Sequence, residues 1–184
     1  MSAASAAIPS PLVVPGGAVH WQPCPGARLA FVFICPGRHE ANRGYPCAAG
    51  TGANLARALV ALHREAPALF PSAQRLDYIV TNAWPVVEYP ALTQRSVPTE
   101  AEVLQPANLT RLAAELRGVE RVVACGAQAH AAVRALAAGG PGGPGFQAAY
   151  ARHLSQRSVN MIPGGSNTDE RITCWARSVL AQWA

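Results

Sequence analysis

The chain has 184 residues, of which half are hydrophobic, so it suits a single globular domain and is not an intrinsically disordered protein. Its formal net charge is +5 and all fifteen basic residues are arginine, which is compatible with an anionic partner such as nucleic acid. The arginines are spread along the chain, so any basic surface must be assembled by folding.

The five cysteines are widely spaced, and they form neither a C-x-x-C pair nor a Cys/His cluster with metal-ligand spacing. We therefore expect no metal and no other cofactor, and a reduced, cytoplasmic protein. The first residues lack the basic segment and the long apolar segment of a secretory signal. No stretch reaches the roughly 20 apolar residues that a membrane span needs, so no membrane partner is expected.

Apolar runs and helical periodicity predict alternating strands and helices after an irregular start. Residues 1–27 are rich in Ala, Ser, Pro and Gly, and we expect them to form an irregular arm that Trp21 tethers to a domain at residues 28–184. Residues 139–145, GGPGGPG, predict a mobile loop. The predicted strands are Leu29–Ile34, Leu76–Thr81, Arg121–Cys125 and Ala148–Arg152, and the predicted helices are Asn54–Arg64, a helix opened by Thr99, Gln128–Ala138 and a last helix from Thr168.

This alternation is typical of a parallel sheet covered by helices. The first strand is apolar throughout, as a parallel strand with both faces covered should be. Thr99, with Glu102 three residues later, forms a capping box that opens a helix, and Pro106 kinks or restarts that helix. The predicted fold class is therefore α/β, a three-layer α/β/α sandwich with a central four-stranded parallel sheet.

The stretch 34–55, ICPGRHEANRGYPCAAGTGANL, joins the first predicted strand to the first predicted helix. In open α/β sheets ligands bind beyond the carboxyl ends of the strands, and glycines there let the backbone approach the ligand. Backbone N–H groups at the start of the helix favour anions such as phosphate. The pattern therefore predicts a ligand-binding loop, with a long surface loop that binds nothing as the alternative.

Polar residues also follow two other predicted strands. Asn82 is either a turn former or helix cap, or an amide that pairs with the donor and acceptor edge of a pyrimidine base. His153, beside Ser155, is either a structural histidine or a site residue. Because parallel strands end at one edge of a sheet, we expect these turns and the glycine-rich loop to meet over one crevice.

Four short motifs, in this order, resemble the uracil-DNA glycosylase superfamily over nearly the whole chain from about Leu29. The run PGRHEANRGYP is closest to the thermophile-type branch, whose first motif lacks an acid. The matching segments are Cys35-Pro36-Gly37, Gly44-Tyr45-Pro46 and Gly50-Thr51-Gly52 for the first motif, Thr81-Asn82 and Arg95–Glu100 for the second, Val122–Ala129 for the third, and His153-Leu154-Ser155 for the fourth.

The resemblance implies a uracil-DNA glycosylase-like fold and a monomeric enzyme that acts on DNA. Such an enzyme flips uracil, or a related deaminated or modified base, out of the helix and hydrolyses its N-glycosidic bond, which leaves an abasic site. His153 then stabilises the negative oxygen of the departing base. The residues implied to bind the base are Asn82, Tyr45, Cys47 and Cys35, and those implied to contact DNA are Pro36, Gly37, Arg38, Ser155, Gln156 and Arg157, with Gln156 or Arg157 filling the gap left by the base.

The chain also departs from the family pattern. Ile34 and Cys35 stand where many members carry the residue that orients the attacking water, and Glu40 and Asn42 are the nearest substitutes as catalytic residues. Cys47 replaces a stacking aromatic residue, for which Tyr45 or Trp84 could substitute, and Leu154 replaces a proline; no iron–sulfur cluster is expected.

Two alternatives to a glycosylase stay open. One is a catalytically inactive DNA- or nucleotide-binding member of the same fold. The other is an unrelated α/β enzyme in which Cys35 or Cys47 pairs with a histidine as the nucleophile.

Overall fold

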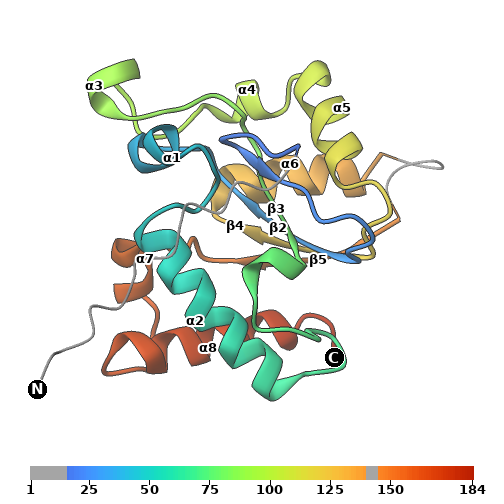
Figure 1. Ribbon diagram of the computed structural model, residues 1–184, viewed down its shortest axis with the longest axis vertical. Helices are drawn as coiled ribbons and strands as arrows, with labels where there is room; N and C mark the ends of the chain where they lie inside the picture. Colours follow the sequence, from blue (N-terminus) through green and yellow to red (C-terminus); the bar gives the residue numbers. More distant parts are fainter. Residues whose placement is uncertain (1–15, 140–144) are drawn as a thin grey trace, which may run out of the picture.

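A five-stranded mixed sheet forms the centre of the molecule (Figure 1). The computed structural model describes residues 16–139 and 145–184. Strands β3, β2, β4 and β5 run parallel, and β1 pairs antiparallel with β3 at one edge. In spatial order the strands are β1 (Trp21–Gln22), β3 (Ile79–Asn82), β2 (Leu29–Phe33), β4 (Arg121–Cys125) and β5 (Gln147–Ala151).

The predicted α/β class is confirmed, but the sheet is neither four-stranded nor entirely parallel. Trp21 and Gln22, from the predicted irregular arm, pair with Thr81 and Val80 and add the fifth strand. The Gln22 amide is buried and donates to the carbonyl of Tyr78 over 3.1 Å. A strand of two residues carries no detectable periodicity, so only its long-range partners reveal it. The rest of the predicted arm, residues 1–15, and residues 140–144 of the predicted loop lie outside the described residues.

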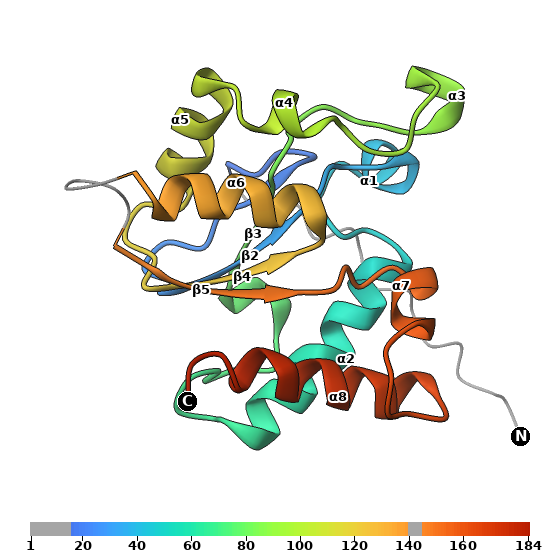
Figure 2. The ribbon, with the colours of Figure 1, turned by 180° about the vertical axis from the view of Figure 1, so that it is seen from behind.

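Strand β2 is buried on both faces, and its alternate side chains belong to two different cores. Phe31 and Phe33 pack in the core on one face of the sheet. Helices α2 (Gly50–Glu65) and α8 (Thr168–Leu180) cover this face (Figure 2). Ala30 and Val32 belong to the core on the other face, with residues of α5 (Pro106–Glu115) and α6 (Ala127–Ala137). Complete burial of a side chain such as Phe31 stabilises the fold by roughly 2–3 kcal/mol.

The remaining helices are short, except for α5 and α6, which cover the second face of the sheet (Figure 2). Their bounds are α1 (Arg38–Arg43), a 3₁₀ turn (Arg75–Asp77), α3 (Pro90–Thr93), α4 (Glu100–Val103), α5 (Pro106–Glu115), α6 (Ala127–Ala137) and α7 (Gln156–Asn160). The capping box at Thr99 is confirmed, because its hydroxyl accepts from the Glu102 N–H and the Glu102 carboxylate accepts in return. Pro106 begins a new helix, as predicted.

Several boundaries differ from the prediction, most of them by a single residue. The predicted loop after β2 contains α1, and α2 begins at Gly50, four residues before the predicted start at Asn54. Strand β3 begins at Ile79 and not at Leu76, because the residues before it form the 3₁₀ turn. These differences arise where glycine-rich or polar sequence gives no clear apolar period.

Candidate functional site

The carboxyl ends of β2, β3 and β5 bring the predicted site segments to the same edge of the sheet. Phe33, the last residue of β2, is the register partner of Asn82. Its ring also meets the His153 imidazole edge-on, with ring centroids 5.6 Å apart. In Figure 2, α1, α7 and the start of α2 lie around this edge. Asn82 and His153 therefore both flank Phe33, as the expected convergence requires.

The crossover helices that follow β2 and β4, α2 and α6, pack on opposite faces of the sheet, and open α/β sheets form a ligand crevice at such a point. Gly126 follows β4 with φ of 101°. A Cβ at Gly126 would lie 2.7 Å from Ile34 Cδ1 and 3.4 Å from His153 Cβ. The side chain of Ile34 therefore packs against Gly126, next to the histidine, where β2 and β4 end.

His153 is half-buried and neutral at physiological pH. Burial lowers the pKa of its imidazole to about 4, although the charge of Glu40 acts in the opposite direction. The backbone N–H of Ser155 donates to Nδ1 over 3.0 Å. Since Nδ1 accepts, the single proton of the neutral ring is on Nε2. The local backbone thus produces a neutral N–H donor at the carboxyl edge of the sheet.

Glu40 joins the two ends of the loop that follows β2. Its Oε2 accepts from the Gly37 N–H over 3.0 Å, and its Oε1 accepts from the Ala48 N–H over 3.0 Å. These bonds hold the start of α1 against the residues that precede α2. The charge of Glu40 acts to raise the pKa of His153, against the larger effect of burial.

The glycine-rich turn before α2 is tightly packed. Cys47 is buried and has φ of 53°, in the left-handed region. Arg75 donates to the carbonyls of Pro46 and Cys47, and its guanidinium lies 5.0 Å from the centroid of the Tyr45 ring. One face of Tyr45 is therefore covered by an arginine, and Cys47 packs in the core beneath.

Gly52 allows the first turn of α2 to contact the Cys47 carbonyl. A Cβ at Gly52 would lie 1.9 Å from that oxygen, whereas a Cβ at Gly50 would meet nothing within 4 Å. We expect Gly52→Ala to destabilise the protein by more than about 2 kcal/mol, and Gly50→Ala to be neutral or stabilising by up to about 1 kcal/mol. Urea unfolding of the two variants measures this difference. Equal effects of the two substitutions would contradict the close contact.

Asn82 is almost completely buried and contacts the segment before β1. Its Nδ2 donates to the His20 carbonyl over 3.1 Å, and its own carbonyl accepts from Arg111 Nη2 over 3.0 Å. The His20 ring lies 3.1 Å from the buried Glu115, which accepts a hydrogen bond from Thr81, the neighbour of Asn82 in β3. Sequence reasoning missed His20 and Glu115, because they are far from Asn82 in the chain and carry no motif.

Asn54, at the start of α2, is a second residue that sequence reasoning missed. Its side chain is buried, and Nδ2 donates to the Leu154 carbonyl over 3.0 Å and to Gln156 Oε1 over 3.3 Å. Oδ1 accepts from Arg57. Asn54 therefore ties α2 to the loop that carries His153. The sequence did carry a signal for this role, because Asn54 is a polar residue on a helix face whose other buried positions are apolar.

The predicted DNA-contacting residues of the first loop lie in different environments. Pro36 is buried, and its carbonyl accepts from the Glu88 N–H over 2.9 Å. Gly37 is the N-cap of α1. Arg38 and Asn42 are exposed on α1, and the Arg38 guanidinium lies 5.0 Å from the centroid of the Tyr89 ring.

The predicted DNA-contacting residues after His153 form the start of α7. The Ser155 hydroxyl accepts from the Ser158 N–H and caps the helix. The Gln156 amide donates to Asn160 and, at 3.3 Å, to Thr168. Arg157 is exposed. Of this group, Arg157 presents its side chain most freely to a partner.

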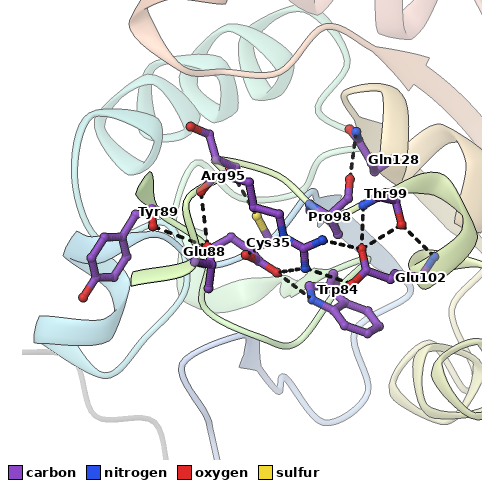
Figure 3. Close-up of polar contacts among 11 residues, drawn as sticks. Cys35, Trp84, Glu88, Tyr89, Arg95, Pro98, Thr99, Glu102 and Gln128 are labelled. Carbon is purple, nitrogen blue, oxygen red and sulfur yellow. Dashed lines mark hydrogen bonds and ion pairs between the residues drawn. The ribbon is translucent and has the colours of Figure 1, made fainter. Parts of the chain in front are cut away.

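A cluster of hydrogen bonds and ion pairs centred on Arg95 connects parts of the loop between β3 and α4 (Figure 3). Arg95 Nη2 donates to Glu88 Oε1 over 2.5 Å, and Nη1 donates to Glu102 Oε2 over 2.7 Å. Trp84 Nε1 also donates to Glu88, whose carboxylate is buried. The hydrogen bonds from Arg95 hold the pKa of Glu88 below its usual value. The arginine of the second motif therefore joins the loop to the capped start of α4.

The environments of Cys35 and Cys47 do not favour a cysteine nucleophile. Burial, together with the charges of Glu88 and Glu40, raises the pKa of Cys35 to about 12. Burial raises the pKa of the Cys47 thiol well above its ordinary value. Both groups are thiols at neutral pH, and the thiolate is the reactive form.

A cavity of about 490 Å³ opens at the opposite, amino edge of the sheet. Leu29, Tyr78 and Arg121 contribute to its wall, which also contains the paired Arg28 and Glu120. Neither His153 nor Glu40 reaches it, so we place the candidate site at the carboxyl edge, where those two groups interact.

Within residues 16–139 and 145–184, no three His, Cys, Asp or Glu side chains gather as a metal site would require. In the same part of the chain, no helix has both the length and the apolar character needed to cross a membrane. No protein-family model matches this sequence, and a search among curated proteins finds no match.

Proposed function

We propose that this protein is a DNA glycosylase that hydrolyses the N-glycosidic bond of uracil, or of a related deaminated or modified base, after the base has flipped out of the helix. The observation that carries the proposal is the neutral imidazole of His153, whose Nδ1 accepts from a backbone N–H and whose Nε2 therefore carries the proton. The finer fold assignment, a three-layer sandwich of the uracil-DNA glycosylase type, belongs to the same proposal.

The chemistry explains why such a donor is useful. When the glycosidic bond breaks, its electron pair leaves with the base, and an oxygen of the base becomes negative while the sugar becomes oxocarbenium-like. Water then adds to the anomeric carbon and loses a proton, and the departing base anion takes up a proton, so that the products are the neutral base and an abasic sugar. A preorganised N–H directed at the developing oxyanion stabilises the transition state more than the ground state. A neutral imidazole that carries its proton on Nε2 provides this hydrogen bond without first having to be protonated.

We assign to Glu40 the role of orienting the attacking water molecule. Each of its carboxylate oxygens accepts one backbone hydrogen bond, which fixes the group in place. A carboxylate oxygen has capacity for a second hydrogen bond, so Glu40 can still accept from a water molecule. Its electrostatic interaction with His153 supports a shared site for the two catalytic groups.

Exposed arginines support DNA as the substrate. Arg38 and Arg43 lie on α1 and Arg157 lies on α7, the two short helices beside the carboxyl edge (Figure 2). Arginine side chains in such positions bind phosphates and make association depend on salt concentration. The chain's net positive charge also favours association with a polyanion such as DNA.

Duplex oligonucleotides that each contain one uracil, hypoxanthine or hydroxymethyluracil test this proposal. We expect alkali-labile breaks at the modified position and none in the matched duplex with thymine. Because the chain has no lysine to form a Schiff base, strand cleavage should require the alkali step. Intact strands for every base, at enzyme concentrations that saturate the DNA, would reject the glycosylase assignment.

A second candidate function is DNA binding without catalysis. It is favoured by the two residues before Pro36: Ile34 packs against Gly126, and the Cys35 thiol lies 3.7 Å from the Ser96 carbonyl. Neither can orient a water molecule as a carboxylate does. Salt-sensitive binding to duplex DNA, with no breaks after alkali, would select this function.

A further inference from the structure

The side-chain amide of Asn82 has a defined orientation. Its Nδ2 is 3.1 Å from the His20 carbonyl oxygen, and only the NH₂ group of an amide can donate to a carbonyl. Oδ1 must therefore point away from His20. Within residues 16–139 and 145–184, no protein donor forms a hydrogen bond to Oδ1, so this acceptor has no protein partner there even though Asn82 is only 2% exposed.

The His20 carbonyl is presented by a short hydrogen-bonded turn. The Ala18 N–H donates to the Trp21 carbonyl over 2.7 Å, and the Trp21 N–H donates to the Ala18 carbonyl over 3.0 Å. Trp21 then pairs with Thr81, the neighbour of Asn82 in β3. Strand β1 thus places the His20 turn directly beside the end of β3.

A buried carboxylate holds the His20 side chain. His20 Nε2 lies 3.1 Å from Glu115 Oε1, and the carboxylate can only accept in this contact. Glu115 also accepts from Thr81 over 2.5 Å and from Arg111 over 2.7 Å. Burial by itself raises the pKa of Glu115, but these hydrogen bonds outweigh it and keep the pKa below its usual value, so the group is an anion. The His20 turn is therefore linked to β3 and α5 through one charged acceptor.

We propose that the His20 turn is the positioning element of the base-binding site: it orients Asn82 so that Oδ1 faces the flipped base as a hydrogen-bond acceptor. This inference rests on the proposed glycosylase function. An acceptor in this position requires a base with an N–H on its pairing edge. Deamination creates such a group, because the ring nitrogen of the parent base is an acceptor and that of the lactam product is a donor. His20 positions Asn82 and does not itself contact the base.

The first experiment compares uracil with N3-methyluracil in otherwise identical duplexes. The methyl group replaces the N–H donor and leaves the glycosidic bond unchanged, so we expect excision of N3-methyluracil to be slower by roughly tenfold or more. If uracil is excised and N3-methyluracil is excised equally fast, the inference is wrong while the proposed function stands.

The second experiment uses His20→Ala, with His63→Ala as a matched control. His63 is likewise a histidine whose ring is held by one hydrogen bond, since its Nδ1 lies 2.7 Å from the Phe70 carbonyl oxygen, but it belongs to the distant end of α2. We expect His20→Ala to lower kcat for uracil by roughly tenfold and to narrow the preference for uracil over N3-methyluracil. His63→Ala should keep the preference for uracil over N3-methyluracil, even if this variant is less stable than the unmodified protein. An unchanged preference in His20→Ala would overturn the inference.

The third experiment does not depend on activity. In the isotope-labelled full chain, the side-chain NH₂ protons of Asn82 should exchange with solvent more slowly than those of the exposed Asn42, and His20→Ala should remove much of this protection. Exchange as fast as that of Asn42 in the unmodified protein would refute the orientation of the amide. If the amide is protected but no base is excised, the orientation stands and the base-binding role fails together with the proposed function.

Discussion

His153→Ala lowers the rate of base excision by about 10²- to 10³-fold, the expected loss when one preorganised donor to a developing oxyanion is removed. The effect should appear in the single-turnover rate with enzyme in excess, because the Nε2 donor acts after the base has entered the site. DNA affinity, measured by fluorescence anisotropy, should change little. The rate falls because the transition state loses a hydrogen bond that the ground state does not need.

His39→Ala is the matched control for this measurement. His39 is an exposed histidine on α1, next to Glu40 in the chain, and no hydrogen bond of its ring is seen within the described residues. We expect this variant to retain nearly the full excision rate. An excision rate in His153→Ala close to that of the unmodified protein would show that the oxyanion donor is another group.

Acidification from pH 7 to pH 4 should reduce the free energy of unfolding through His153 by about 3 kcal/mol. The folded imidazole has a pKa of about 4 because burial disfavours its charged form, whereas a histidine in the unfolded chain has a pKa near 6.5. Between these two values the unfolded chain binds a proton that the folded chain does not. Stability is therefore complete above about pH 6.5 and decreases as the pH falls toward 4.

The measurement is urea unfolding at pH 7 and at pH 4 for the unmodified protein and for His153→Gln. Glutamine does not titrate, so the variant should lose about 3 kcal/mol less stability on acidification. Carboxylates with a lowered pKa, such as Glu88 and Glu115, also destabilise the fold in acid, but they contribute equally to both proteins. Parallel losses of stability in the two proteins would show that His153 is not held neutral by burial.

The same property links stability to the proposed chemistry. A histidine that resists protonation stays a neutral donor at mildly acidic pH, so excision should continue down to about pH 5 if His153 carries it. The same buried histidine destabilises the fold in acid, because the unfolded chain then binds a proton that the folded chain does not. Such a conflict between stability and local environment is typical of functional sites.

The amino-acid sequence by itself determined the elements that local physics specifies. The apolar run at Leu29–Phe33 produced a strand buried on both faces, the reciprocal Thr99 and Glu102 side chains opened α4, and Pro106 restarted the chain as α5. Each depends on residues within a few positions of one another. The alternation of these elements was also sufficient to place β2, β3, β4 and β5 in one parallel arrangement.

Only the tertiary structure decided which polar groups meet. Asn82 bonds to the carbonyl of a residue 62 positions away, and Asn54 bonds to the Leu154 carbonyl 100 positions away. Strand β1, too short to show a period, exists because its backbone satisfies the free edge of β3. The tautomer and the low pKa of His153 likewise depend on burial against Phe33 and on the Ser155 N–H. Local sequence does not encode such contacts, because they form only when the folded sheet and its covering helices bring distant segments together.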